Sequence, residues 1–131
     1  MKKILLLAIS TMVLTLSLQA GKAYPLLESK EGIEFLNTTQ IKEIFKDGTT
    51  IVGTNFKFNK EVVQNYKGDG TYFGTVASGK KKVSGKWFVE DNTICHTPKN
   101  KNKKKCREIY KKDDFYYELN GKKIIMNFKL K

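Results

Sequence analysis

The chain has 131 residues, which is enough for one small domain. Its 40% apolar and 11% aromatic residues are typical of a globular protein with a packed core, and they exclude a bundle of membrane helices and a disordered acidic chain. Because the sequence has one histidine and two cysteines, we expect no metal site, no cofactor and no catalytic residues. Basic residues outnumber acidic residues by 25 to 13, and the formal net charge is +12.

Residues 1–20 have the pattern of a secretory signal peptide. Two lysines precede an apolar stretch at residues 4–18, which is shorter than the ~20 apolar residues of a membrane-spanning helix. Cleavage is predicted after Ala20 or after Ala23, and an uncleaved N-terminal anchor is the alternative. Removing residues 1–20 takes away the two lysines and no acid, which lowers the net charge from +12 to +10. The short, lysine-rich start is typical of bacterial leaders, so we expect a periplasmic or secreted protein without an integral membrane anchor.

Residues 21–36 show no regular period and predict an extended lead-in to a domain at residues 37–131. This domain begins with a short helix. Asn37 is a good N-cap residue, and Gln40 stands three positions on, where a capping box needs its reciprocal partner. The apolar residues that follow have helical spacing: Ile41, Ile44 and Phe45. A helix of about nine residues is unstable alone, so its apolar face must pack against the rest of the domain.

The sequence after Gly48 is typical of an all-β domain, because short strand-like segments recur between turn signals. The predicted strands are residues 49–55, 60–67, 71–77, 82–90, 93–97, 105–111, 115–120 and 122–130. Seven or eight strands of this kind predict an antiparallel meander that forms a small barrel or a strongly curved sheet, since closure removes exposed strand edges.

Two dipeptides predict tight hairpins and therefore strand register. Asn120-Gly121 favours a two-residue type I′ turn, which pairs Leu119 with Lys122. In this register one apolar face points to the interior: Phe115, Tyr117, Leu119, Ile124, Met126, Phe128 and Leu130.

The same argument at Asp91-Asn92 pairs Val89 with Ile94 and turns both inward. Phe88 and Cys95 then lie together on the outer face.

Cys95 and Cys106 are expected to form a disulfide, because an exported chain meets an oxidising compartment and two cysteines allow one pairing. The lysine-rich segment between them predicts a solvated hairpin loop. Closing a loop this short stabilises the fold by about 3 kcal/mol in the chain-entropy model. A free thiol pair with a redox or metal role is the alternative, and the lack of a C-x-x-C spacing argues against it.

Several motifs occur in an order that resembles a known family. They are TTQIKEIFKDG at residues 38–48, TTIVGT at 49–54, the Asp69-Gly70 turn, GKWFVEDNTIC at 85–95, and REIYKKDDFYYEL at 107–119 after the second cysteine. Together they resemble a family of small exported bacterial domains of unknown function, usually described as lipocalin-like. The resemblance covers residues 38–120. It implies a small antiparallel barrel and an envelope location, and it implies no activity.

Lysine makes up 24 of the 25 basic residues, and Arg107 is the only arginine. Nucleic-acid sites favour arginine, and export separates the protein from that partner, so we expect no nucleic-acid binding. A solvated lysine surface produced by AT-rich coding is one explanation. The other is a docking surface for anionic envelope material, such as lipopolysaccharide phosphates or acidic glycans. The candidate anion-binding residues are Lys99, Lys101, Lys103, Lys104 and Lys105, with Lys80, Lys81 and Lys82 as a second group.

Five aromatic side chains are candidates to line an interior cavity: Trp87, Phe73, Phe115, Tyr117 and Phe128. An eight-stranded barrel holds packed side chains or one small ligand, and large rings on short strands favour a filled interior. The single histidine, His96, is predicted to lie beside Trp87 as an ordinary strand residue. The acidic pairs Glu90-Asp91 and Asp113-Asp114 are predicted turn residues rather than acid–base pairs.

These patterns predict a non-enzymatic protein of the bacterial envelope that binds an anionic or amphipathic molecule, such as an anionic lipid or glycan. Two alternatives remain open. One is a lipocalin-like carrier of a small apolar ligand, and the other is an inhibitor or partner of another exported protein. No oligomeric state is predicted.

Overall fold

The computed structural model describes residues 24–77 and 79–131, in which the chain forms one helix and eight strands. The elements are α2 (Thr38–Ile44), β1 (Thr49–Asn55), β2 (Lys60–Tyr66), β3 (Thr71–Val76), β4 (Lys81–Glu90), β5 (Thr93–Pro98), β6 (Lys105–Lys112), β7 (Phe115–Asn120) and β8 (Lys123–Leu130). The predicted signal peptide at residues 1–20 and both predicted cleavage positions lie outside the described residues. Within those residues, no helix combines the length and the apolar character that a membrane crossing requires.

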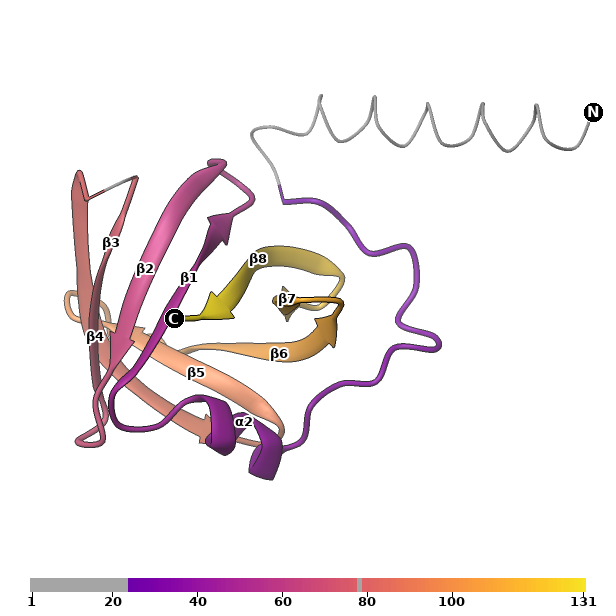
Figure 1. Cartoon of the computed structure of the whole chain (residues 1–131), viewed down its shortest axis with the longest axis horizontal. Coiled ribbons are helices and arrows are strands. Elements are labelled where there is room, and N and C mark those ends of the chain that lie inside the picture. Colours follow the sequence, from indigo (N-terminus) through magenta and orange to yellow (C-terminus); the bar gives the residue numbers. More distant parts are fainter. Residues whose placement is uncertain (1–23, 78) are drawn as a thin grey trace, which may run out of the picture.

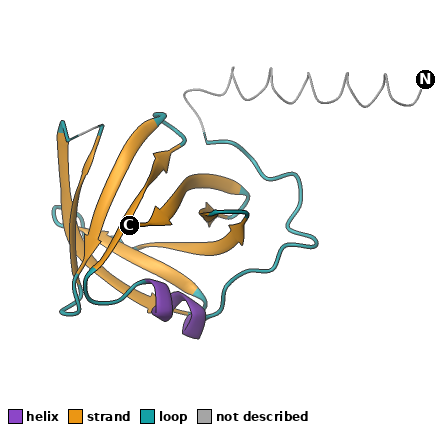
Figure 2. Ribbon diagram, viewed as in Figure 1, coloured by secondary structure: helices purple, strands orange, loops and turns teal. Residues whose placement is uncertain are grey.

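Each strand pairs antiparallel with the next, and β1 also pairs with β8, so the eight strands close into a barrel. Figure 1 shows the strands wound around a common interior. Figure 2 shows that most of the described chain is in strands and that the helix lies at one end of them. The predicted all-β fold, a short helix followed by an antiparallel meander, is confirmed. Closure supplies each strand with two neighbours and so removes exposed edges.

Helix α2 begins at the predicted capping box. The Asn37 side chain accepts a hydrogen bond from the Gln40 backbone N–H, and the Gln40 side chain accepts one from the Asn37 N–H, both at 2.9 Å. The backbone N–H of Thr38 donates to Oδ1 of Asn92 at 2.8 Å. These bonds satisfy N–H groups that have no partner within the helix, and they attach α2 to the β4–β5 turn.

The apolar face of α2 closes one end of the barrel (Figure 1). Ile41 and Ile44 are buried, and the Phe45 ring lies 4.8 Å from the Tyr66 ring and 5.6 Å from the Phe128 ring, between centroids. Such tilted and edge-on aromatic contacts add to the gain from burying apolar area. The helix is therefore held by packing rather than by its own propensity.

The described part of the lead-in, residues 24–36, runs beside the barrel toward α2 (Figure 1). Two isolated bridges attach it, because Leu26 pairs with Lys123 and Phe35 pairs with Tyr110. Both partners lie where β8 and β6 extend past their neighbours β1 and β5. The lead-in therefore covers backbone groups that the barrel leaves unpaired.

The β4–β5 hairpin has the predicted register. Asp91 and Asn92 have positive φ angles of +48° and +60°, as a type I′ turn requires. Val89 pairs with Ile94, and Ile94 is fully buried. Phe88 lies on the outer face, as predicted.

The β7–β8 hairpin differs from the prediction. Its loop is Gly121-Lys122 rather than Asn120-Gly121, and Asn120 pairs with Lys123. Gly121, with a φ of +63°, occupies the first loop position, where a type II′ turn places glycine.

A β-bulge then shifts the pairing of β8 again. Leu119 pairs with Ile124 but Glu118 pairs with Met126, so Ile125 is an extra residue on β8. The shift turns Phe115 and Tyr117 away from the interior and buries Glu118 inside the barrel, where it is 3% exposed, while Leu119 stays fully buried.

Candidate functional site

A groove crosses the outer face of β3, β4 and β5. Its volume is about 560 Å³, within the range of about 300–1,000 Å³ that is usual for small-molecule sites. Its lining residues are Thr71, Tyr72, Ser84, Gly85, Lys86, Thr97, Pro98, Lys99, Lys101 and Asn102.

Strand register aligns the polar side chains of this groove. Lys86 of β4 pairs with Thr71 of β3 on one side and with Thr97 of β5 on the other. Alternate residues of a strand share a face. The outer face of β4 therefore presents four exposed side chains in a row: Lys82, Ser84, Lys86 and Phe88.

Gly85 permits the close approach of β4 and β5 beneath the groove. A Cβ atom at this position would lie 2.3 Å from the carbonyl oxygen of Thr97 and 3.0 Å from Cε1 of Tyr72. The position therefore requires glycine. The Tyr72 ring lies on the inner side of β4 beneath the groove, where it is 5% exposed and contacts the His96 ring.

The groove carries unbalanced positive charge, because three lysines line it and no carboxylate is among its lining residues. Hydroxyl and amide groups of threonine, serine and asparagine add hydrogen-bonding capacity. Asp69 lies beside the groove, where its carboxylate accepts a hydrogen bond from the Thr71 hydroxyl at 2.6 Å. That bond lowers the pKa of Asp69. A lining of this kind can hold a phosphate, sulfate or carboxylate group.

Some of the lysines predicted to bind anions line the groove, and others do not. Lys99 and Lys101 line the groove. Lys104 does not line the groove. Its Nζ lies 2.6 Å from Oε2 of Glu90, so its charge is paired.

Lys105 lies among several like charges. Partial burial lowers its pKa, and repulsion from Lys101, Arg107, Lys103 and Lys57 lowers it further. Lys57 belongs to the β1–β2 turn, so two basic segments meet at this end of the barrel.

Lys86 is the central groove residue that the sequence analysis missed. A lysine between apolar strand residues has the pattern of an ordinary solvated position. The hairpin register predicted from Asp91-Asn92 places Lys86 opposite Thr97. This pairing is the signal in the sequence that could have identified Lys86 as a groove residue. In the second predicted group, Lys82 lines a neighbouring groove, while Lys80 and Lys81 are exposed outside both grooves.

The neighbouring groove adjoins the first across β4 and has a volume of about 480 Å³. Its lining residues are Val63, Asn65, Phe73, Gly74, Thr75, Lys82, Val83 and Ser84. Phe73 was predicted to line the barrel interior, and this prediction is wrong. Phe73 pairs with Ser84, stands on the outer face and is 47% exposed.

Two of the other predicted cavity-lining aromatics lie inside. Phe128 is fully buried, and the Trp87 ring packs edge-on against Tyr66 at 5.4 Å. The prediction is wrong for Phe115 and Tyr117, because the β8 bulge turns their side of β7 outward.

The interior also contains a group of polar side chains. Oη of Tyr66 lies 2.6 Å from Nε2 of His96 and donates to Oε1 of Gln64 at 2.8 Å. Burial, with a further contribution from Arg107, lowers the pKa of His96 to about 3. Burial raises the pKa of Glu118 to about 7, against the opposing effect of Arg107. Oε2 of Glu118 has no hydrogen-bond partner within the described residues. None of these five side chains lines the groove.

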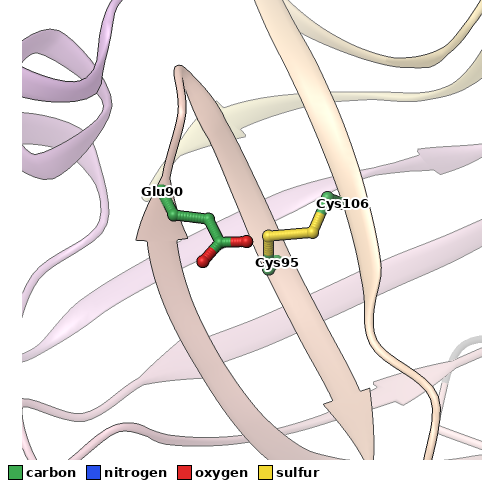
Figure 3. A group of neighbouring side chains, drawn as sticks. All are labelled: Glu90, Cys95 and Cys106. Atoms are coloured by element: carbon green, nitrogen blue, oxygen red, sulfur yellow. A yellow bond between two sulfur atoms is a disulfide. The ribbon is translucent and has the colours of Figure 1, made fainter.

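Cys95 and Cys106 form the predicted disulfide between β5 and β6 (Figure 3). The Glu90 carboxylate points toward this bond, and a carboxylate oxygen and the two sulfurs lie within 4.8 Å of one another. Sulfur binds metals as a thiolate, which a disulfide does not provide. The bond instead closes the loop that carries Lys99 and Lys101.

Comparison of the chain with protein-family models, with curated proteins and with solved structures finds no match. The resemblance to lipocalin-like domains stays a prediction.

Proposed function

We propose that this protein is an exported, non-enzymatic binding module that holds an anionic molecule of the bacterial envelope in the groove formed around Lys86, Lys99 and Lys101. The observation that carries the proposal is that three lysines and no carboxylate line this groove. Unbalanced positive charge in a concave site attracts anions and raises their local concentration. The net charge of +10 that remains after removal of residues 1–20 acts in the same direction at longer range.

Two features support an envelope location. The disulfide is of a kind that forms and persists in oxidising compartments such as the periplasm. Residues 1–20 have the composition of a leader. The ligand is therefore sought among envelope anions, such as phosphorylated lipids and acidic glycans.

A carrier of apolar ligands, which is one of the two alternatives, has less support, and so has an enzyme. A carrier of a small apolar ligand needs an open interior, whereas here the rings of Phe45, Tyr66 and Phe128 pack against one another inside the barrel. An enzyme needs reactive groups at its binding site, and His96 instead bonds to Tyr66 in the interior.

The proposal is tested by calorimetric titration of pyrophosphate at low ionic strength. The variant Lys86→Gln/Lys99→Gln/Lys101→Gln removes the three groove charges. An exposed ion pair contributes about 0.5 kcal/mol, so the loss of three lowers the affinity about tenfold.

A matched control is Lys111→Gln/Lys112→Gln/Lys129→Gln, which removes the same charge from positions outside the groove. The control should keep its pyrophosphate affinity within about twofold. An equal loss of pyrophosphate affinity in the two variants would show that only the net charge of the protein matters. That result would overturn the assignment of the site to the groove.

A further inference from the structure

We propose that this groove is one part of a longer site whose ligand is an acidic polysaccharide, a chain of sugar units that bear carboxylate or sulfate groups. The inference rests on the proposed function and adds the length and the class of the ligand. It is carried by the continuity of two grooves and by two exposed phenylalanines on the same face.

The two grooves meet at Ser84, which lines both. Along the outer face of β4, the exposed side chains run from Lys82 to Phe88 without interruption at alternate positions. At about 3.3 Å per residue this row is about 20 Å long. It is therefore longer than one phosphate group or one sugar unit and matches a short chain of units.

Positive charge is distributed along this row rather than concentrated at one point. Lys82 lies in one groove, Lys86 lies in the other, and Lys99 and Lys101 lie at its edge on the β5–β6 loop. A single small anion contacts one or two of these ammonium groups. A polymer with a repeated negative charge contacts them all, so its binding energy adds along the row.

Two phenyl rings lie on the same face. Phe73 is 47% exposed and pairs with Ser84, and Phe88 is 37% exposed four residues farther along β4. The two positions are therefore about 13 Å apart along the row. The Nζ atoms of Lys67 and Lys104 lie 5.4 Å and 5.6 Å from the respective ring centroids. Each ring thus offers a flat apolar surface next to a cation, and the C–H face of a sugar ring packs on such a surface.

The chemistry of this face favours a glycan over a nucleic acid or a bilayer. Nucleic-acid sites rely on arginine, and Arg107 pairs with the buried Ile94 on the interior side of the barrel. A bilayer surface is bound by apolar side chains that project together from one end or edge. Here the two rings are separated along a strand by serine and lysine, and the hydroxyl and amide groups of both grooves suit sugar hydroxyls.

The experiment compares a galacturonate hexamer with the galacturonate monomer by calorimetry on the exported protein. The hexamer should bind about tenfold more tightly than the monomer. Phe73→Ala should lower hexamer affinity about fivefold and leave pyrophosphate affinity unchanged. Phe58→Ala, which removes a 60% exposed ring from the β1–β2 turn, is the matched control and should change neither. Phe88→Ala repeats the test if Phe73→Ala lowers the melting temperature.

The outcomes separate this inference from the proposed function. Equal affinities for hexamer and monomer, or tighter binding to oligothymidine or to phosphatidylglycerol vesicles, would overturn the polysaccharide assignment. Pyrophosphate binding that depends on the groove lysines would then still support the proposed function. If the groove lysines also proved irrelevant to pyrophosphate, both proposals would fail.

Discussion

The phenolic oxygen of Tyr66 lies 2.6 Å from Nε2 of His96, a hydrogen bond that joins β2 to β5 inside the barrel. The same hydroxyl donates to Oε1 of Gln64 at 2.8 Å. A hydroxyl has one hydrogen, so Nε2 of His96 carries the proton of its bond to Tyr66. Burial raises the pKa of Tyr66 and lowers that of His96. The two side chains therefore form an uncharged link across the interior.

Tyr66→Phe should lower the free energy of unfolding by about 1–3 kcal/mol, because it leaves His96 and Gln64 without a buried partner. The ring remains in place against Phe45. Urea denaturation measures the change. The control Tyr117→Phe, at a half-buried position on the outer side of β7, should stay within about 0.5 kcal/mol of the parent. Equal effects in the two variants would contradict the interior network.

His96 should make stability fall with acid. Its pKa is about 3 in the folded chain against 6.5 ordinarily, so the unfolded chain takes up a proton first as the pH drops. The stability that His96 contributes is fully present above pH 6.5 and is lost as the pH falls toward 3, with a slope of at most about 1.4 kcal/mol per pH unit. Below pH 4.5 Glu118 contributes no opposing slope, so His96→Gln, when its unfolding is measured, should lack the parent's loss of stability between pH 4.5 and 3. A variant with the parent's acid sensitivity would show that His96 is not the cause.

Glu118 should have the opposite effect. Burial raises its pKa from 4.5 to about 7, so the folded chain prefers the protonated carboxyl. The stability that Glu118 contributes is fully present below pH 4.5 and is lost as the pH rises to about 7. Between pH 4.5 and 6.5 the slopes of Glu118 and His96 oppose each other. Glu118→Gln should therefore be more stable than the parent above pH 7, and its acid slope should steepen between pH 4.5 and 6.5. Identical pH profiles for the two proteins would refute this assignment.

Loss of the disulfide should weaken both the fold and the groove. Cys95→Ala/Cys106→Ala should lower the free energy of unfolding by about 3 kcal/mol, because the loop between β5 and β6 is no longer closed. Alanine is chosen because Cys95 is fully buried. Pyrophosphate affinity should fall as well, since Lys99 and Lys101 stand on this loop. Urea denaturation and calorimetry measure the two effects, and unchanged values would count against a structural role for the bond.

Most elements of the fold follow from local signals in the sequence. The capping box at Asn37 and Gln40 predicts where α2 begins. The Asp91-Asn92 turn predicts the β4–β5 register, and with it the outer position of the disulfide. These signals suffice because each acts over a few residues and agrees with the alternation of apolar positions around it.

The β7–β8 register does not follow from local pattern. Ile124, Ile125 and Met126 are consecutive apolar residues, so either face of β8 can be buried, and the bulge at Ile125 depends on tertiary packing. For this reason the interior face predicted for this hairpin does not include Glu118, which the structure buries. The groove was missed for a related reason, because Lys86 acquires its partners only when three strands and a loop meet.

Binding of anions in the groove around Lys86 can be observed residue by residue in a nuclear magnetic resonance titration of the labelled protein with pyrophosphate. Backbone amide shifts should change at residues 84–86 and 97–101, and these changes should disappear in Lys86→Gln/Lys99→Gln/Lys101→Gln. Changes centred instead on residues 111–112, or changes that persist in that variant, would show that anions do not bind in this groove.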